Sequence, residues 1–422
     1  MLIEFRLENH RSIAEEQALT MVATGRSAPA DLRPRKVSGV STPLLPVAAI
    51  YGANASGKSN LLLGMELMRD AVRDSHRSWL PEGGVPRDPF AWGPRRSDPT
   101  LVEVTFVSDS VRYRYGFVAD DERFLEEWLY AWPRGREQMW FEREGDTFRF
   151  GEHLRGENRL IEQVTRPNAL FLSAAVQHRH VQLSAVYSWF ARLQMVGMKR
   201  RRAGLLHAEM WLSRQLRQRD NIQASLFDEA VDVPETSDRL QAFRNWLREA
   251  DVGISDVKVS KDEVSRMGPR RRIYLQHGKG NEDAWLPLEE ESQGTVTLVL
   301  LAPKVIDALS QGGVVIIDEL EASLHPLLGL QIVRHFNSPE TNPRNAQLLF
   351  TTHDTNLLGT MYGPTPLRRD QVWLAEKNEE GTSRIFPLTD YSPRAEENLE
   401  RGYLQGRYGA IPFLPNLLDL DG

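Results

Sequence analysis

Residues 52–59 read GANASGKS, and this short stretch limits the possible folds of the chain more than any other. It matches the pattern G-x-x-x-x-G-K-[ST], whose glycines let successive backbone N–H groups point at one phosphate group. The apolar run at 47–51 predicts a buried strand directly before it. Apolar residues at helical spacing follow it, namely Leu61, Met65, Met68 and Val72. A strand, a glycine-rich loop and a helix in this order predict an α/β domain that binds the phosphates of a nucleotide.

The residue types of this loop each suit one part of a magnesium nucleotide. Gly52 and Gly57 allow the tight turn of the backbone. Lys58 is placed to reach the β and γ phosphate oxygens, and Ser59 to coordinate Mg²⁺. ATP and Mg²⁺ are therefore the expected cofactors. The residues that we expect to contact ATP are Gly52, Asn54, Ala55, Ser56, Gly57, Lys58, Ser59 and Asn60.

A second buried strand ends in two carboxylates, because residues 314–319 read VVIIDE. An aspartate at the carboxyl end of a strand beside the phosphate loop can hold Mg²⁺, so Asp318 is the predicted metal ligand. Glu319 is then placed to act as the general base that takes a proton from the attacking water. In isolation, the same pair would also suit the N-cap of a helix. Lys58 and Asp318 are 260 residues apart, so a large insertion divides the nucleotide-binding core.

The chain divides into three expected segments. Residues 1–180 hold the phosphate loop and, at 101–150, runs typical of antiparallel strands joined by tight polar turns. Residues 181–285 are expected to form a helical lobe with a basic face, because 192–220 contain eight Lys or Arg against two acidic residues. Residues 286–422 hold the acidic strand and the C-terminal tail.

Composition excludes several classes of protein. The formal net charge of −6 argues against a globally basic nucleic-acid coat protein, although not against a local basic patch. With zero cysteines there is no thiolate metal site, disulfide or cysteine nucleophile, which suits a reducing compartment. The charged start MLIEFRLENHRS does not read as a signal peptide, and no later run approaches the roughly 18 apolar residues that span a membrane. We therefore expect a cytoplasmic protein without a membrane partner.

A short motif precedes the acidic strand, and its distance from Asp318 helps to identify it. Residues 290–297 read EESQGTVT and place Ser292 and Gly294 at the start of a helical run, 26 residues before Asp318. After the acidic strand, residues 319–326 read ELEASLHP. The spacing and order of these motifs resemble the signature motif and the D-loop of ATP-binding-cassette (ABC) proteins. The signature departs from the usual LSGGQ, but SQGT keeps the serine and the glycine.

Other parts of the chain extend this resemblance. The run QLLF leads into TTHD, where His353 resembles a switch histidine, although a single histidine is also compatible with an ordinary core residue. The opening phrase LENHRS contains Arg11 and Ser12 and resembles the entry strand of the SMC, RecF and OLD-type ATPases, with His10 at a position that is usually aromatic. Gln177 follows the apolar run LFLSAA, expected to be a strand, and resembles a Q-loop glutamine.

The resemblance implies an α/β ABC-ATPase head with a mixed β-sheet core, an antiparallel β subdomain and a helical lobe inserted before the signature motif. It also implies that two heads pair as a homodimer, or within a higher homo-oligomer. Ser292 and Gly294 would then contact the γ-phosphate bound by the partner. Arg11 and Ser12 would contact the nucleotide, Gln177 would join Ser59 and Asp318 as a metal ligand, and His353 would assist Glu319 and Lys58 in catalysis.

The C-terminal tail, with the phrases DQVWLAEK and SRIFPL, resembles the ATPases of bacterial phage-defence modules, the RloA or AbiL-like group and its PARIS-type relatives. That resemblance implies an ATPase that senses a DNA or phage-protein trigger and controls a separate Toprim-type or RloB-like effector nuclease. A RecF-like DNA-repair ATPase is the alternative, with Lys199–Arg202 and Arg270–Arg272 bound to DNA phosphates. Such basic clusters on a helical face are more typical of solvated or partner-binding surfaces. The insertion and the entry strand argue against a transporter subunit.

Overall fold

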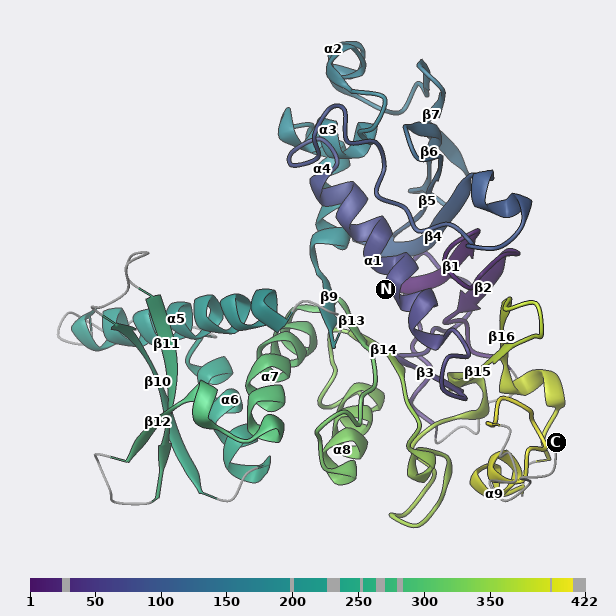
Figure 1. Cartoon of the computed structure of the whole chain (residues 1–422). Helices are drawn as coiled ribbons and strands as arrows, with labels where there is room; N and C mark the ends of the chain where they lie inside the picture. Colours follow the sequence, from purple (N-terminus) through teal and green to yellow (C-terminus); the bar gives the residue numbers. More distant parts are fainter. Residues whose placement is uncertain are drawn as a thin grey trace.

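The computed structural model describes residues 1–24, 31–197, 201–225, 236–250, 253–262, 270–278, 284–394 and 397–412. A seven-stranded antiparallel sheet and a six-stranded mixed sheet form the body of the molecule, and a third, three-stranded sheet belongs to a lobe at its side (Figure 1). The expected α/β class, with one mixed and one antiparallel sheet, is confirmed.

The six-stranded sheet carries the two predicted strands of the nucleotide core. Its order is β16-β15-β3-β14-β13-β9, and all neighbouring pairs are parallel except β15 with β16. Strands β3, β13 and β14 are buried along their whole length, which is typical of parallel strands covered on both faces. The strands of this sheet are β3 (Val47–Gly52), β9 (Leu193–Val196), β13 (Val314–Ile317), β14 (Gln347–Thr351), β15 (Val372–Lys377) and β16 (Ser383–Pro387).

Helices cover both faces of this sheet. Helix α1 (Lys58–Asp74) packs on the face that carries Ala48 and Ile50, and all four predicted stripe residues, Leu61, Met65, Met68 and Val72, are buried. The opposite face packs against α7 (Gln293–Gln311) and α8 (Pro326–Asn337). A short helix near the C-terminus, α9 (Leu399–Leu404), packs on the same face beside β3, where Tyr403 meets Tyr51 with ring centroids 5.5 Å apart.

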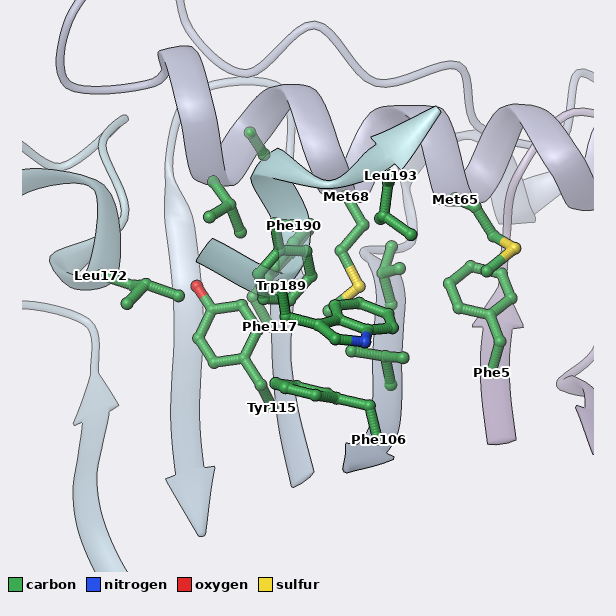
Figure 2. Close-up of a cluster of buried hydrophobic side chains, with 14 of the residues drawn as sticks. Phe5, Met65, Met68, Phe106, Tyr115, Phe117, Leu172, Trp189, Phe190 and Leu193 are labelled. Atoms are coloured by element: carbon green, nitrogen blue, oxygen red, sulfur yellow. The ribbon is translucent and has the colours of Figure 1, made fainter. Parts of the chain in front are cut away.

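The antiparallel sheet confirms the strands expected at 101–150. Its order is β2-β1-β4-β5-β6-β7-β8. One face packs on α1 through a cluster in which the Phe106 ring stacks on Trp189, with centroids 4.2 Å apart. Met68 of α1 points toward this pair, and Met65 toward Phe5 of β1 (Figure 2). The strands are β1 (Leu2–Glu8), β2 (Gln17–Thr20), β4 (Thr100–Ser108), β5 (Val111–Ala119), β6 (Phe124–Trp132), β7 (Gln138–Glu144) and β8 (Thr147–Phe150).

Three short helices close this core, namely α2 (Asn158–Val164), α3 (Phe171–Gln177) and α4 (Val181–Ala191). The strand expected around 170–175 is therefore wrong, since these residues form α3. The reason is a buried carboxylate: Glu127 accepts hydrogen bonds from the backbone N–H groups of Phe171 (2.7 Å) and Leu172 (3.1 Å), which would otherwise be unpaired at a helix N-terminus. Burial raises the pKa of Glu127, and the nearby Arg143 opposes that shift.

The inserted lobe differs from the helical lobe expected at 181–285. Helix α4 and strand β9 belong to the body of the molecule, because Leu193–Val196 pair with β13 in a parallel register. The lobe proper begins after them and adds an antiparallel sheet to two helices. Its elements are α5 (Arg201–Ser225), α6 (Thr236–Ala250), β10 (Ile254–Asp262), β11 (Arg270–His277) and β12 (Trp285–Pro287).

The structure describes only some of the basic residues that the sequence analysis named for DNA binding. Lys199 and Arg200 lie outside the described residues, and so do the side chains at 201, 202, 270 and 271. Arg272 is exposed on β11, opposite Ser260 of β10. Across the described part of the chain, no helix combines the length and apolar character needed to cross a membrane.

Candidate nucleotide-binding site

The loop between β3 and α1 encloses the side chain of Lys58. Gly57 has φ of 99°, in the region that favours glycine, and is the N-cap of α1. Lys58 is 6% exposed, and its Nζ donates to the carbonyl oxygens of Gly52 (2.8 Å) and Ala53 (2.9 Å). Burial lowers the pKa of Lys58, whereas Asp318, Glu319 and Glu321 oppose that shift. The ammonium group therefore lies inside the loop, with three carboxylates close enough to favour its charged form.

Three elements meet at the carboxyl ends of the parallel strands. The hydroxyls of Ser59 on α1 and Thr351 on β14 each donate to Asp318 Oδ1 at 2.7 Å. Residues 259 apart in the sequence thus touch directly. The register explains the bond from Thr351: Ile317 pairs with Phe350, so Asp318 and Thr351 follow as neighbours at the carboxyl ends of β13 and β14. A hydroxyl and a carboxylate are hard oxygen ligands, so Ser59 and Asp318 fit Mg²⁺.

Glu319 projects from this edge. It is exposed and has φ of 56°, and its backbone N–H donates to Thr351 Oγ1 at 2.7 Å. The Thr351 hydroxyl therefore links both acidic residues, donating to one side chain and accepting from the backbone of the next. This bond fixes the backbone at Glu319 and leaves its carboxylate facing solvent beside Asp318.

His353 lies beside a carboxylate that sequence analysis did not single out. Glu321 accepts hydrogen bonds from Thr352 Oγ1 (2.7 Å) and from the backbone N–H of His353 (2.6 Å). Partial burial and the charge of Lys58 lower the pKa of His353, while Glu321 and Glu319 oppose the shift. The imidazole is thus near the phosphate-loop lysine, as expected for a residue of the same site. Glu321 and Thr352 belong to the quoted motifs ELEASLHP and TTHD, but their residue types alone gave no reason to select them.

Ser12 supports the loop from the opposite side. Its hydroxyl accepts from Asn60 Nδ2 at 2.6 Å and lies 2.7 Å from the Ser383 hydroxyl. Ser383, the first residue of β16, also donates to the Ser56 carbonyl at 2.7 Å. Nothing in the sequence marked Ser383, because a lone serine at a strand start has no distinctive pattern. Ser56 Oγ is buried beside Gly52 and has no hydrogen-bond partner among the described residues.

Arg11 lies next to Ser12 at the outer rim. It has φ of 54°, and its guanidinium pairs with Asp88 at 2.6 Å. Its backbone N–H also donates to the Asp88 carbonyl at 2.7 Å. The structure thus places Ser12 against the phosphate loop, whereas the Arg11 side chain pairs with Asp88. That both residues contact a nucleotide stays a prediction.

The proposed signature motif lies at the start of helix α7, where Gln293 lines one cavity together with Asp318 and Glu319. Ser292 is the exposed N-cap of α7 and accepts from the Thr295 N–H at 3.1 Å. A Cβ on Gly294 would lie 3.0 Å from the Ser323 carbonyl, so the start of α7 packs on the loop that follows Glu319. Among the described residues, neither Ser292 nor Gly294 has a hydrogen bond to residues 52–60.

Gln177 is far from the loop. It is the exposed last residue of α3, and its neighbour His178 lies 5.8 Å, ring to ring, from His76 beyond the C-terminal end of α1. Since α1 has 17 residues, it places roughly 25 Å between that end and the phosphate loop. Gln177 therefore cannot reach a metal ion held by Ser59 and Asp318. From this side of the fold, Gly197 approaches the backbone of Asp318, and a Cβ at Gly197 would lie 2.5 Å from the Asp318 carbonyl.

These features define a P-loop ATPase domain of ABC-like architecture. A family model described as "AAA domain, putative AbiEii toxin, Type IV TA system" matches residues 47–359, from the strand before the phosphate loop to the segment after His353. The match covers most of the chain, and the chain belongs to this family.

Similarity to individual proteins is more limited. The chain is 28% identical over 156 residues to the Septu protein PtuA of Bacillus mycoides (strain KBAB4), a match to 32% of this chain and 22% of that relative. The chain thus matches about a fifth of the relative's length. The SMC head bound to the C-winged helix domain of ScpA is 13% identical, with 91% and 97% of the chains covered and a TM-score of 0.46. The SMC head domain from Thermotoga maritima is 13% identical, with 92% and 98% covered and a TM-score of 0.38.

Proposed function

We propose that this chain is an ATP-binding and ATP-hydrolysing switch of a bacterial anti-phage, abortive-infection system, and that it controls a separate effector nuclease. The observation that carries the ATPase half is the 2.7 Å bond from the Ser59 hydroxyl to Asp318. It joins the phosphate loop and the acidic strand across the whole insertion, at the edge where Lys58, Glu319 and His353 also lie.

Each residue has a role that its position supports. Lys58 and the backbone N–H groups of the loop would hold the β and γ phosphates, and Ser59 and Asp318 would hold Mg²⁺. Bound MgATP supplies the phosphoanhydride bond that is broken and the cation that offsets charge on the leaving oxygens. Glu319, exposed beside Asp318, would accept the proton of the attacking water. His353, with its backbone fixed by Glu321, would donate a hydrogen bond near the γ-phosphate oxygens.

The defence half draws on the family and on the relative. The family description names an AbiEii toxin and a Type IV TA system, and the partial match to PtuA connects the chain to a Septu protein. The C-terminal phrases resemble defence ATPases that work with a Toprim-type or RloB-like nuclease. ATP binding would pair two heads, and a DNA or phage-protein trigger would change that pairing and release or activate the nuclease.

Equilibrium binding of labelled ATP and steady-state hydrolysis, each with and without Mg²⁺, test the ATPase half. Lys58→Ala removes the charge that offsets the phosphate oxygens, so we expect ATP affinity and turnover both to fall. Glu319→Gln keeps the side-chain shape but cannot take up a proton, so it should bind ATP and hydrolyse it about 10² to 10⁴ times more slowly. The exposed Lys36→Ala serves as the control and should match the wild type. Unchanged ATP affinity in Lys58→Ala would remove the phosphate-loop assignment.

Phage infection of cells that carry the chain with its neighbouring genes tests the defence half. We expect the wild type to protect cells and Lys58→Ala to give no protection at an equal protein level. Full protection by Lys58→Ala would show that nucleotide binding is not the switch. Absence of protection by the wild type, with a neighbouring nuclease gene present, would contradict the defence role.

A further inference from the structure

A cavity of about 720 Å³ lies between the body of the molecule and the inserted lobe. Its walls come from the second half of α1, strand β9, the start of α5, helix α7 and the loop after β13, and β9, α5 and α7 meet where the lobe joins the body (Figure 1). Asp318 and Glu319 belong to its lining, but no residue of the phosphate loop at 52–60 does, although the structure describes that loop in full. The cavity is therefore a neighbour of the nucleotide site, and its volume suits a small molecule.

Lys304 of α7 brings a positive charge to the wall of this cavity. Among the described residues it forms no ion pair, and its one hydrogen bond goes to the Met195 carbonyl of β9. An ammonium group has three N–H donors, so this bond leaves two of them for other acceptors. Burial and the charge of Arg69 lower the pKa of Lys304 to about 8, and Glu66 opposes that shift. The charge of Lys304 is thus only partly offset by the protein, and an anion in the cavity would offset the rest.

His207 of α5 adds a second polar group to the same wall. Its Nδ1 is buried and has no hydrogen-bond partner in the part of the chain that the structure describes. Burial, with the charges of Lys304 and Arg214, lowers the pKa of His207 to about 4, so the imidazole is neutral and lies near Lys304. A neutral imidazole can donate one hydrogen bond to an anionic oxygen. Lys304 and His207, on two different helices, therefore both lack a matching acceptor beside one cavity.

The carboxylates of α1 do not supply that acceptor. Glu66, whose charge acts on Lys304, is held by Arg69 of its own helix at 3.3 Å. Arg69 is 7% exposed, so this ion pair is shielded from solvent. Helix α1 gives the wall one further residue of each sign, Arg73 and Asp74. Glu66 is thus already engaged with an arginine, and Lys304 keeps its remaining donors for a ligand.

Strand β9 connects Lys304 with the predicted metal ligand. Lys304 holds the Met195 carbonyl, and the carbonyl of the next residue, Val196, accepts from the backbone N–H of Asp318 at 3.1 Å. A ligand that draws the ammonium away from Met195 would therefore act on the strand that positions Asp318. Gln293, the first residue of α7, also lines the cavity. Both ends of the ATPase machinery, the acidic strand and the start of the signature helix, thus border this space.

We infer that this cavity binds a small molecule through a phosphate or carboxylate group at Lys304, and that the bound ligand slows ATP hydrolysis. The binding site goes beyond the proposed function, whereas the effect on hydrolysis rests on it. One anionic oxygen accepts from the Lys304 ammonium and from His207. The rest of the ligand lies along the apolar side chains that α7 gives to the wall, Leu300 and Leu301. Competition with the Met195 carbonyl loosens β9 and, with it, the backbone of Asp318.

Isothermal titration calorimetry of the full chain with inorganic phosphate and with succinate tests the site, and the two probes distinguish a phosphate from a carboxylate ligand. Both titrations use the Lys58→Ala background, so that the phosphate loop contributes little. We expect Lys304→Met to weaken binding of the preferred probe about 10- to 150-fold, the range of a hydrogen bond to a charged group, and Lys304→Arg to keep most of the affinity. The exposed Lys36→Met is the control and should match its parent.

Gly204 of α5 allows the cavity to be filled without a change of charge. The position of a Cβ there has only Leu300 atoms nearby, at 3.8 Å, so an alanine fits. Gly204→Leu should reach further into the cavity and abolish binding of the probe, whereas the matched Gly204→Ala should retain it. Both substitutions favour a helix over glycine, so lost binding in the leucine variant would not reflect a weakened fold.

Steady-state ATP hydrolysis by the wild type, with and without the preferred probe, tests the regulation. We expect the probe to lower turnover in the wild type and to have no effect in Gly204→Leu. Absence of binding by the Lys58→Ala parent, or equal binding after Lys304→Met, would overturn the site. Binding that leaves turnover unchanged would overturn the regulation alone. A wild type that hydrolyses no ATP would refute the proposed function, and the calorimetry would still decide whether the cavity binds an anion.

Discussion

His10 is a polar residue in the phrase LENHRS, at a position where the entry strands of SMC, RecF and OLD-type ATPases usually have an aromatic residue. It is 3% exposed, and neither ring nitrogen has a hydrogen-bond partner among the described residues. Burial, with a contribution from Arg11, lowers the pKa of His10 to about 4. The imidazole is therefore neutral in the folded protein, and it must lose its proton to be buried.

His10 should make the protein sensitive to acid. Its folded pKa is below the unfolded value, so the unfolded state binds more protons between about pH 6.5 and pH 4, and stability falls as the pH falls through that window. We expect this one residue to cost about 2 kcal/mol at pH 5 relative to pH 7.5. His10→Phe removes both the titration and the two unpartnered nitrogens, so its urea midpoint should drop less between pH 7.5 and 5 than that of the wild type.

The exposed His153→Phe is the control, and its urea midpoints should follow the wild type at both pH values. If His10→Phe and the wild type lose equal stability on acidification, then His10 is either paired or exposed in solution. The assignment of a neutral, buried imidazole beside the entry strand would then be wrong.

At the scale of elements, the phosphate loop and the start of β16 fit together only because Gly57 has no side chain. A Cβ there would lie 2.1 Å from the Ser383 hydroxyl and 2.7 Å from that of Ser12, and the backbone is in the left-handed region. Gly135 has a similar φ of 76° but nothing within 4 Å of its Cβ position. Comparing an alanine substitution at Gly57 with one at Gly135 therefore separates the cost of backbone strain from the cost of steric overlap.

We expect Gly135→Ala to lower the free energy of unfolding by roughly 1–2 kcal/mol, the cost of a left-handed alanine, and to leave ATP affinity unchanged. Gly57→Ala should cost more and should also weaken ATP binding, because β16 must move away from the loop. Urea unfolding and ATP binding of both variants measure this difference. Equal effects of the two substitutions would show that the contact between Ser383 and the loop is not tight in solution.

Strong local patterns predicted the elements that carry the chemistry. Helix α1 has apolar residues at helical spacing directly after the glycines of the phosphate loop. Strand β13 is a fully apolar run directly before two carboxylates. In both cases the residue types alone were enough to predict the element. Helix α3 could not be predicted in the same way. Its short apolar run suits a strand or a helix equally well, and Glu127, 44 residues earlier, decides between them by capping the helix.

The same distinction applies to the site. Lys58, Ser59 and Asp318 belong to motifs in which each residue type has a chemical reason to occur, and the structure brings them together. Ser383 and Glu321 act through contacts that only the tertiary fold creates, so no pattern marked them. The expectation for Gln177 was wrong because it depended on a strand that is a helix.

At the scale of the whole molecule, Ser292 and Gly294 of the proposed signature motif make no hydrogen bond to the phosphate loop of their own chain among the described residues. Ser292 is exposed at the start of the 19-residue helix α7, where its hydroxyl and the helix dipole favour an anion. Within the described residues, the only hydrogen bonds of the Ser292 hydroxyl are to Thr295. We therefore expect Ser292 to act on a γ-phosphate bound by a second head, so that its loss should affect turnover and pairing and leave ATP affinity in one chain unchanged.

Mixing two inactive variants tests this arrangement. Ser292→Arg keeps its own phosphate loop but lacks a working signature, and Lys58→Ala has the reverse defect, so neither homodimer should hydrolyse ATP. In the heterodimer both defects meet at one composite site, and the other site combines an intact Lys58 with an intact Ser292. We expect partial ATPase activity to return in proportion to the heterodimers formed, as measured by native mass spectrometry. If heterodimers form without activity, we would measure nucleotide occupancy of the intact site. An occupied site would mean that the two sites are coupled. An empty site would mean that residues 290–297 do not act across the interface.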